Sequence, residues 1–597
     1  MNATDTILSR IVRLRSQMLY AGVHAYYISG TDPHQSEYMP EHWQTRSFIS
    51  GFSGSAGLVI ITLDKAALWT DSRYFLQAST QLKGTGIELM KQGSTGTPEP
   101  AQWLTQTLIP NDVLGTDFSC LSINQCSKLK QELVANGLSI KNTGDLLNNF
   151  WQNRPALPAT KIFEHDLQYA GTKRTDKIAE ILQLAKTNGA NATLITALDD
   201  LAWTFNLRGK DILYNPVFVG YAFISQKLNT LFVNAEKIDS ELKTKLQEDG
   251  IELLDYSDFF PFLSALSEEF VVMIDPVRTN QKAKKAIPQS VKTIEQTSAP
   301  TLLKAQKSTF EIIHIRETMK KDGVAMIEFL FWLNQNLGKS TITEFDVAEK
   351  LEYFRSQQEE FHGNSFFPIV GLNENGAIVH RSVTKETAAE ITNKGVLLFD
   401  SGGQYLGGTT DITRTISLSK PTDMQKRDFT LVLKGMIGLS MVRFPSGTIG
   451  SNLDAHARMP LWKNGLNYGH GTGHGIGYFL NVHEGPMSIR QEFNEYTIKP
   501  GMVLSNEPGL YREGEYGIRI ENVIVCSEKE ETQFGRFLGF DTLTLCPIDQ
   551  DLIDSELLSK EELVWLNNYH KKVFKELSPR LDIEKVDFLK RLTKEMI

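Results

Sequence analysis

The chain has 597 residues, of which 41% are hydrophobic and 22% charged, a composition typical of ordinary globular proteins. This length exceeds what one hydrophobic core supports, so we expect about three or four domains. A formal net charge of −9 and the lack of a basic cluster argue against nucleic-acid binding. Four cysteines without a CxxC pair suit a reducing compartment, and no apolar run approaches the roughly 20 residues of a membrane span. The N-terminal stretch lacks the apolar region of a signal peptide, so we predict a cytoplasmic protein with no membrane partner.

Two segments of similar length precede residue 300, and both alternate helix-like and strand-like pieces. The prolines of WQNRPALPA (151–159) indicate a linker, and SAPTLL (298–303) marks a second boundary. We therefore predict αβ domains at 1–157 and 158–300, and expect a duplicated fold although no residue-level repeat is visible. Apolar periodicity predicts helices at 7–21 and 173–187 and strands at 25–30, 57–62, 65–71, 192–198, 230–235 and 269–276.

The third predicted domain, residues 301–597, has a different pattern. It opens with a long helical stretch at 311–337 and continues with glycine-punctuated strands. It closes with the charged helix EELVWLNNYHKKVFKEL, residues 561–577.

The stretch YGHGTGHGIGYFLNVHEGP (468–486) has glycine at every second position from Gly469 to Gly477. His470 and His474 have the spacing of a metal-binding helix, but each glycine costs a helix roughly 1 kcal/mol. In a strand the glycines lie on one face and the two histidines, about 13 Å apart, on the other. We therefore expect one metal ligand and one substrate-facing histidine, with His483 just beyond. The alternative is a glycine-rich turn with incidental histidines.

Two aspartates lie in GVLLFDSGGQYLGGTTDITRTISL (395–418). Asp400 ends an apolar strand, and Asp411 follows eleven residues later, beyond two Gly-Gly turns. A hairpin folded about Tyr405 and Leu406 places the two carboxylates opposite each other. A metal ion removes the repulsion between them. The alternative is that both aspartates cap turns.

Two glutamates lie further along, at strand-like positions. Glu507 ends the apolar run of MVLSNEPG, and Glu521 shares a face with Arg519 and Val523 in YGIRIENVIVC. Burying such a glutamate is unfavourable unless it is paired or metal-bound. A structural Arg519–Glu521 ion pair is the alternative.

Together these residues make one donor set. Four carboxylates and an imidazole suit a hard or borderline divalent ion, with manganese ahead of a thiolate-type zinc site, and suffice for two ions. The set is Asp400, Asp411, His474, Glu507 and Glu521.

In this order of residues, and in the segments GHGTGHGIG, NVHEGP, SNEPG and GIRIEN, the sequence resembles the pita-bread metallopeptidases. Within them it is similar to the aminopeptidase P (Xaa-Pro aminopeptidase) group, in its long three-domain cytosolic form. The segments at 32–57, 69–78 and 196–218 resemble the same group, so the likeness covers most of the chain. It implies an α/β (α+β) fold: two creatinase-like N-terminal αβ domains followed by a pita-bread metallopeptidase domain with a C-terminal helical extension.

The resemblance also implies a role for each residue. Asp400 would chelate one manganese ion, Asp411 and Glu521 would bridge both, and His474 and Glu507 would complete the second. Glu507 would also carry the proton of a hydroxide that bridges the ions and attacks the first peptide bond of Xaa-Pro substrates. His380, His470 and His483 match the family's substrate-facing histidines, and Arg519 the arginine beside the last ligand. His380 alone reads only as a strand-end histidine, and Arg381 stands where family members often carry tyrosine.

Other functions remain open at this point. A prolidase-like dipeptidase and a creatinase-type amidinohydrolase are alternatives among enzymes, and a noncatalytic pita-bread peptide-binding module is the alternative outside them. The resemblance further implies a homodimer, for which the exposed-looking Trp462 is a candidate anchor because tryptophan is enriched at interfaces.

Overall fold

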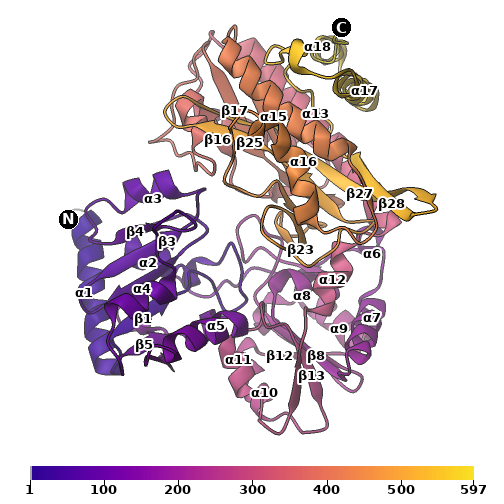
Figure 1. Ribbon diagram of the computed structural model, residues 1–597. Helices are drawn as coiled ribbons and strands as arrows, with labels where there is room; N and C mark the ends of the chain where they lie inside the picture. Colours follow the sequence, from indigo (N-terminus) through magenta and orange to yellow (C-terminus); the bar gives the residue numbers. More distant parts are fainter. Residues whose placement is uncertain (1–2) are drawn as a thin grey trace. The chain divides into compact units, whose positions relative to one another are not determined.

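The computed structural model describes residues 3–597, with side chains from residue 6 onward. Its residues form two compact units (Figure 1). The first unit ends at residue 302 and excludes residues 168–171, which belong with residues 303–597 in the second unit. Among the described residues, no helix is long and apolar enough to cross a membrane.

The first unit contains two six-stranded sheets with the same topology. In the first sheet, the order is β4-β3-β2-β1-β5-β6; β1 to β3 are antiparallel, and the outer strands β4, β5 and β6 join in parallel. The second sheet, β12-β11-β10-β8-β13-β14, repeats this pattern strand for strand. The expected duplication is therefore confirmed at the level of the fold.

The strands of the first sheet are β1 (Ala25–Ile28), β2 (Leu58–Thr62), β3 (Ala66–Thr70), β4 (Glu88–Lys91), β5 (Val113–Thr116) and β6 (Ser139–Asn142). Those of the second are β8 (Ala192–Ile195), β10 (Tyr221–Ser225), β11 (Asn229–Phe232), β12 (Ile251–Leu254), β13 (Val271–Ile274) and β14 (Lys292–Glu295). The central strands of both sheets are continuous apolar runs because helices cover them, which buries both faces. Helices α1 (Ala3–Ala21) and α7 (Arg174–Thr187) match the predicted ones, and the predicted boundary at 298–303 lies in helix α12 (Ala299–Ala305).

The second unit builds its core between long helices and several antiparallel sheets. The long predicted helix is α13 (Thr309–Asn336), and the charged C-terminal one is α17 (Lys560–Leu577). Helices α17 and α18 (Ile583–Leu592) lie beside α13 at the C-terminal end of the unit (Figure 1). The other long helices are α14 (Glu344–Ser356), α15 (Asp423–Met441) and α16 (Gly450–Trp462).

Three sheets of the second unit carry the residues of interest. A three-stranded sheet, β16-β17-β20, contains β16 (Ile369–Leu372), β17 (Val396–Ser401) and β20 (Ile412–Ser417). A two-stranded ribbon contains β25 (Gly509–Arg512) and β26 (Tyr516–Arg519). A six-stranded sheet, β21-β28-β27-β24-β22-β23, contains β21 (Arg443–Pro445), β22 (Gly473–Gly475), β23 (Glu484–Ile489), β24 (Val503–Asn506), β27 (Asn522–Thr532) and β28 (Gly535–Thr542).

A buried histidine on α17 makes this part of the fold sensitive to acid. His570 is 1% exposed, and its Nε2 accepts a hydrogen bond from the backbone N–H of Ile548, so the ring must stay neutral there. Burial, with the nearby Arg414 guanidinium, lowers the pKa of His570 from its usual 6.5 to about 4.

Since the folded state binds the proton more weakly, the contribution of His570 to stability is intact above pH 6.5 and is lost as the pH falls toward 4. Between pH 7 and pH 5 we expect His570 alone to contribute a loss of about 2 kcal/mol in the free energy of unfolding, read as the difference between the wild type and His570→Gln. Urea titrations at both pH values measure the loss. His570→Gln should show a smaller one, and an equal loss in both proteins would contradict this assignment.

Candidate metal centre

A hairpin brings the two aspartates together, as the sequence predicts. Strand β17 pairs antiparallel with β20, with Asp400 opposite Thr413 and Ser401 opposite Ile412. Asp411 is the residue just before β20 and therefore lies at the same end of the strand pair as Asp400. The inner turn closes with Tyr405 paired to Gly408, in agreement with the predicted fold-back at Tyr405 and Leu406.

The alternating glycines have a steric reason. A Cβ atom on Gly473 would lie 2.1 Å from the carbonyl oxygen of Ser505 on β24, and one on Gly475 would lie 2.3 Å from that of Glu484 on β23. Glycine therefore lets β22 run closely between its two neighbouring strands. The strand is only three residues long and has a register irregularity at His474, so the long extended strand that we predict is wrong in its length.

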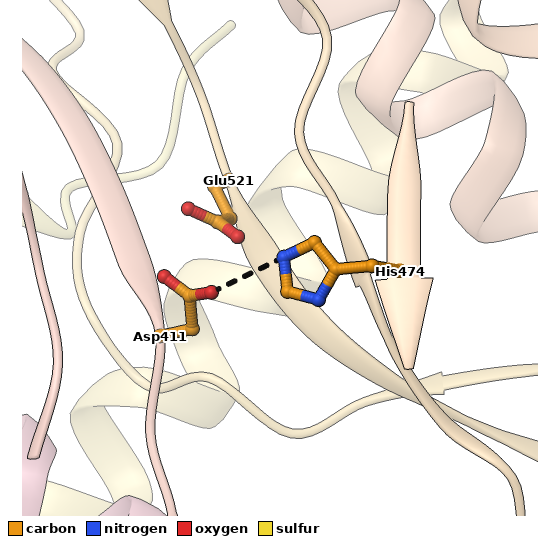
Figure 2. Close-up of side chains that lie close together, drawn as sticks. All are labelled: Asp411, His474 and Glu521. Carbon is orange, nitrogen blue, oxygen red and sulfur yellow. Dashed lines mark ion pairs between the residues drawn. The ribbon is translucent and has the colours of Figure 1, made fainter. Parts of the chain in front are cut away.

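Four side chains from separate strands and loops converge next to β22. Figure 2 shows the side chains of Asp411, His474 and Glu521 directed toward one another. One ligand atom from each of these three lies within 4.8 Å of the others, an arrangement that suits a metal ion. The Nε2 atom of His474 lies 3.5 Å from Asp411 Oδ2 and 3.4 Å from Glu507 Oε1. Glu507 follows β24 directly, so the strand end fixes its position.

The charges of this cluster call for a cation. Burial raises the pKa of Asp411 well above its usual range, and the carboxylates of Glu521, Asp400 and Glu507 raise it further. Burial likewise raises the pKa of Glu521 well above its usual range, and that of Glu507 to about 7. The buried atoms Asp400 Oδ1 and Glu521 Oε1 accept no hydrogen bond from any residue that the structure describes. Such oxygens are the donors that hard divalent ions bind, so the residues fit a metal site.

Arg519 supports the cluster from behind. Its Nη2 donates to Asp400 Oδ2 at 2.6 Å, its Nε to Thr413 Oγ1 at 3.1 Å, and its Nη1 to the hydroxyl of Tyr511 at 2.7 Å. Thr413 in turn donates to Glu521 Oε2 at 2.8 Å. Arg519 forms an ion pair with Asp400. Strand β26 ends at Arg519 and β27 begins at Asn522, so Arg519 and Glu521 do not lie on one continuous strand as the sequence predicts.

Tyr511 and Thr413 were not predicted from the sequence, although each has a detectable signal. Thr413 lies two residues after Asp411 at the start of β20, so the two-residue period of a strand places both side chains on one face. Tyr511 lies four residues after Glu507 on β25, where the hairpin with β26 places it two positions from the pairing partner of Arg519.

The three other histidines lie at different distances from the cluster. The ring of His483 lies 4.4 Å from that of His474, centroid to centroid. His470 places its Nε2 2.8 Å from the hydroxyl of Tyr511 and its Nδ1 2.8 Å from the carbonyl of Gly471. His380 is half-buried in the loop after the short helix η6 (Asn373–Ala377), not at a strand end as predicted, and the carbonyl of its neighbour Val379 accepts from Arg519 at 3.4 Å.

These positions predict a difference between His474 and His470. His474→Ala should lose bound metal, because His474 belongs to the group of three residues that could hold an ion. His470→Ala should keep the metal and lower turnover, because the Nε2 atom of His470 contacts the hydroxyl of Tyr511. His483→Ala should behave like His470→Ala. Metal analysis of the purified variants measures the contrast. Equal metal loss from the 470 and 474 variants would show that both histidines bind the ion.

Models of known protein families match four segments of the chain. Residues 10–150 and 153–311 each match the creatinase/prolidase N-terminal domain. Residues 313–528 match metallopeptidase family M24, and residues 536–596 match the C-terminal region of that peptidase family. The convergent carboxylates and histidines all lie within the M24 segment.

Individual relatives cover nearly the whole chain. A probable Xaa-Pro aminopeptidase P of Laccaria bicolor is 40% identical over 98% of this chain and 93% of its own, and one of Aspergillus niger is 41% identical over 96% of both. The chain therefore belongs to the Xaa-Pro aminopeptidase P family of M24 metallopeptidases.

Two solved structures are similar to this fold. The X-prolyl aminopeptidase of Caenorhabditis elegans, described as a cytosolic enzyme with a di-nuclear active site, superposes with a TM-score of 0.96 at 33% identity and covers 99% of this chain and 100% of its own. A Xaa-Pro dipeptidase of Bacillus anthracis, with a TM-score of 0.51 at 22% identity over 63% of this chain and 99% of its own, shares the fold alone.

Proposed function

We propose that this enzyme is a metal-dependent aminopeptidase that hydrolyses the first peptide bond of substrates with proline at the second position. The observation that carries the proposal is the convergence of Asp411, His474, Glu521 and Glu507 beside Asp400, in a chain of the Xaa-Pro aminopeptidase P family. The C. elegans relative has a di-nuclear site, and the donor set here offers enough oxygens for two divalent ions. We propose manganese for both, since four carboxylates outnumber one imidazole.

In this proposal the ligands divide between two positions. Asp400 would hold one ion, His474 and Glu507 would hold the other, and Asp411 and Glu521 would contribute to both. Burial, and after it the neighbouring carboxylates, raises the pKa of Asp411 and of Glu521, and bound cations would relieve the repulsion among these carboxylates. Arg519 holds Asp400 in orientation through the hydrogen bond to Oδ2, which leaves Oδ1 for an ion.

When bound, the two ions supply an acidified water as nucleophile and a Lewis acid for the peptide carbonyl. Glu507 would take up a proton at its carboxylate and deliver it to the departing nitrogen. His483, whose ring lies against that of His474, donates a hydrogen bond to the oxyanion. His470 and His380 face the substrate, and the ring of His470 is oriented by Tyr511.

Selectivity for proline is reasonable on chemical grounds. An Xaa-Pro bond has no amide N–H, so a site that depends on that donor fails with such substrates. A site that offers a shaped wall to the pyrrolidine ring succeeds, and we assign that wall to His470 and His380. This proposal requires a free N-terminal amine, because the site has room for only one residue before the scissile bond and none for an acetyl group.

The test is a panel of three tripeptides and the dipeptide Arg-Pro, each incubated with the manganese-loaded protein. Arg-Pro-Pro should release arginine, whereas Arg-Ala-Ala and N-acetylated Arg-Pro-Pro should be cleaved far more slowly. Chromatography of the products identifies the bond that breaks. Comparable cleavage of the alanine or acetylated peptide would overturn the assignment, and cleavage of only the dipeptide Arg-Pro would identify a prolidase-like dipeptidase instead.

We further propose domain boundaries near residues 157 and 300, a cytosolic location and a homodimer. The family matches at 10–150 and 153–311 support the first boundary, and the end of the first compact unit at residue 302 supports the second. The relative described as cytosolic supports the location. Trp462 is 40% exposed at the end of α16, as an interface residue of the free chain can be. Light scattering at micromolar concentration tests the dimer, and a mass near that of one chain would exclude it.

A further inference from the structure

The loop that carries His380 is attached to the metal centre on both sides of that histidine. Before it, the carbonyl of Val379 accepts a hydrogen bond from the Arg519 guanidinium that also holds Asp400. After it, Ser382 pairs with Ile369 of β16, and Ile369 pairs with Asp400 of β17. The backbone on either side of His380 therefore leads, within one or two contacts, to Asp400.

A third attachment comes from the residue between these two. Arg381 forms an ion pair with Glu344, the first residue of α14, whose side chain is fully buried. Its guanidinium also donates to the carbonyls of Val370, at 3.3 Å, and Thr387, at 2.7 Å. Arg381 thus spans from a strand beside Asp400 to the far end of the loop, and its own side chain is 10% exposed.

The carboxylate of Glu344 also accepts hydrogen bonds from other parts of the loop. One carboxylate oxygen accepts from the backbone of Leu372 at 2.8 Å and from the side chain of Asn375 at 2.9 Å. The other accepts from the backbone of Ala389 at 2.9 Å as well as from Arg381. These donors are spread over residues 372–389, so one buried carboxylate fixes both ends of the loop, and the Arg381 cation balances its charge.

We infer that the Arg381–Glu344 ion pair is a positioning device that holds His380 at the substrate side of the metal centre. The inference rests on the proposed function, because it assigns His380 to the substrate. The side chain of Arg381 is committed to Glu344 and the loop carbonyls, so this residue acts on the substrate only through the placement of His380.

The test compares kinetics in two backgrounds. Arg381→Met should lower the kcat for Arg-Pro-Pro between about 10-fold and 100-fold, because a misplaced substrate contact has effects of that size. Metal content should remain that of the wild type. In the His380→Ala background the same substitution should have no further effect, since both act through one side chain. Arg381→Lys, which keeps the charge, should recover part of the loss. Lys434→Met, which breaks a half-buried ion pair with Glu562 between α15 and α17, is the matched control and should leave kcat unchanged.

Hydrogen exchange of the metal-free proteins adds a measurement that does not depend on activity. Arg381→Met should raise exchange in residues 373–389 and leave β17 and β20 protected. The inference is overturned by an unchanged kcat, by losses that multiply in the double variant, by a lysine variant no better than methionine, or by unchanged exchange in the loop. If the wild type cleaves none of the peptides, the proposed function fails, and the exchange measurement alone decides whether the ion pair holds the loop.

Discussion

Asp411→Asn and Glu521→Gln are each expected to abolish peptidase activity, with a loss of at least about 1,000-fold, while the protein stays folded. Each substitution keeps the size and most hydrogen bonds of the side chain. It removes one negative charge from a site in which several carboxylates lie close together. Both carboxylates have raised pKa values caused first by burial and then by their neighbours, so the metal-free site is under repulsion. The neutral variants relieve that repulsion and remove a ligand at the same time.

Thermal unfolding separates these two consequences. Without metal, the variants should unfold at or above the temperature of the metal-free wild type, because a repulsive charge is gone. With manganese, the wild type should gain stability by mass action and the variants much less. Glu528→Gln, an exposed partner of Arg536 on the β27–β28 hairpin, is the control and should keep both activity and the manganese effect. Variants with normal metal-induced stabilisation would contradict the ligand assignment.

The second large effect that we expect is a loss of stability when the buried ion pairs of Glu484 are broken. Glu484 begins β23 directly after His483, and its buried carboxylate binds Lys307 and lies 3.5 Å from Lys304. All three side chains are at most 2% exposed. Glu484→Gln removes the buried negative charge that faces Lys307 and Lys304, so we expect it to lower the free energy of unfolding by about 3–5 kcal/mol. Lys307→Met should lower it less, because Lys304 still pairs with the carboxylate.

Chemical unfolding of the two variants, each saturated with manganese, measures this order. Glu317→Gln, which breaks an exposed ion pair with Arg580, is the control, and its effect should stay below about 1 kcal/mol. If Lys307→Met is more destabilising than Glu484→Gln, the shared anion is not what holds this cluster together.

Local patterns were enough to predict that the two aspartates lie close together, whereas their role as metal ligands stays a proposal. Asp400 and Asp411 could be paired because two glycine pairs between apolar strands indicate a hairpin, and the structure has that hairpin. The alternating glycines argue against a helix that would place His470 and His474 on one face, and the resemblance to the family, not the spacing, assigns His474 as the ligand. The length of β22 could not be predicted, since it depends on the bulge at His474 and on the carbonyls of Ser505 and Glu484 from distant strands.

Contacts between residues far apart in the sequence could not be predicted from local sequence patterns. Arg519 reaches Asp400, 119 residues earlier in the chain, and no periodicity near either residue indicates that pairing. Lys307 and Glu484 are 177 residues apart, and a lysine at the start of an amphipathic helix reads as exposed. The edge strand β14 was missed because only one of its four residues, KTIE, is apolar, whereas β12 (IELL) and the central strand β10 (YAFIS) were missed despite their apolar residues.

We propose that catalysis needs two divalent ions held by the cluster of Asp400, Asp411, His474, Glu507 and Glu521. The most direct measurement is a titration of manganese into the metal-free protein, with bound metal and Arg-Pro-Pro hydrolysis followed on the same samples. We expect two ions bound per chain and activity that rises with occupancy to a plateau at the second equivalent. Full activity in the metal-free sample, or binding that persists unchanged when Asp411 and Glu521 are both neutralised, would contradict it.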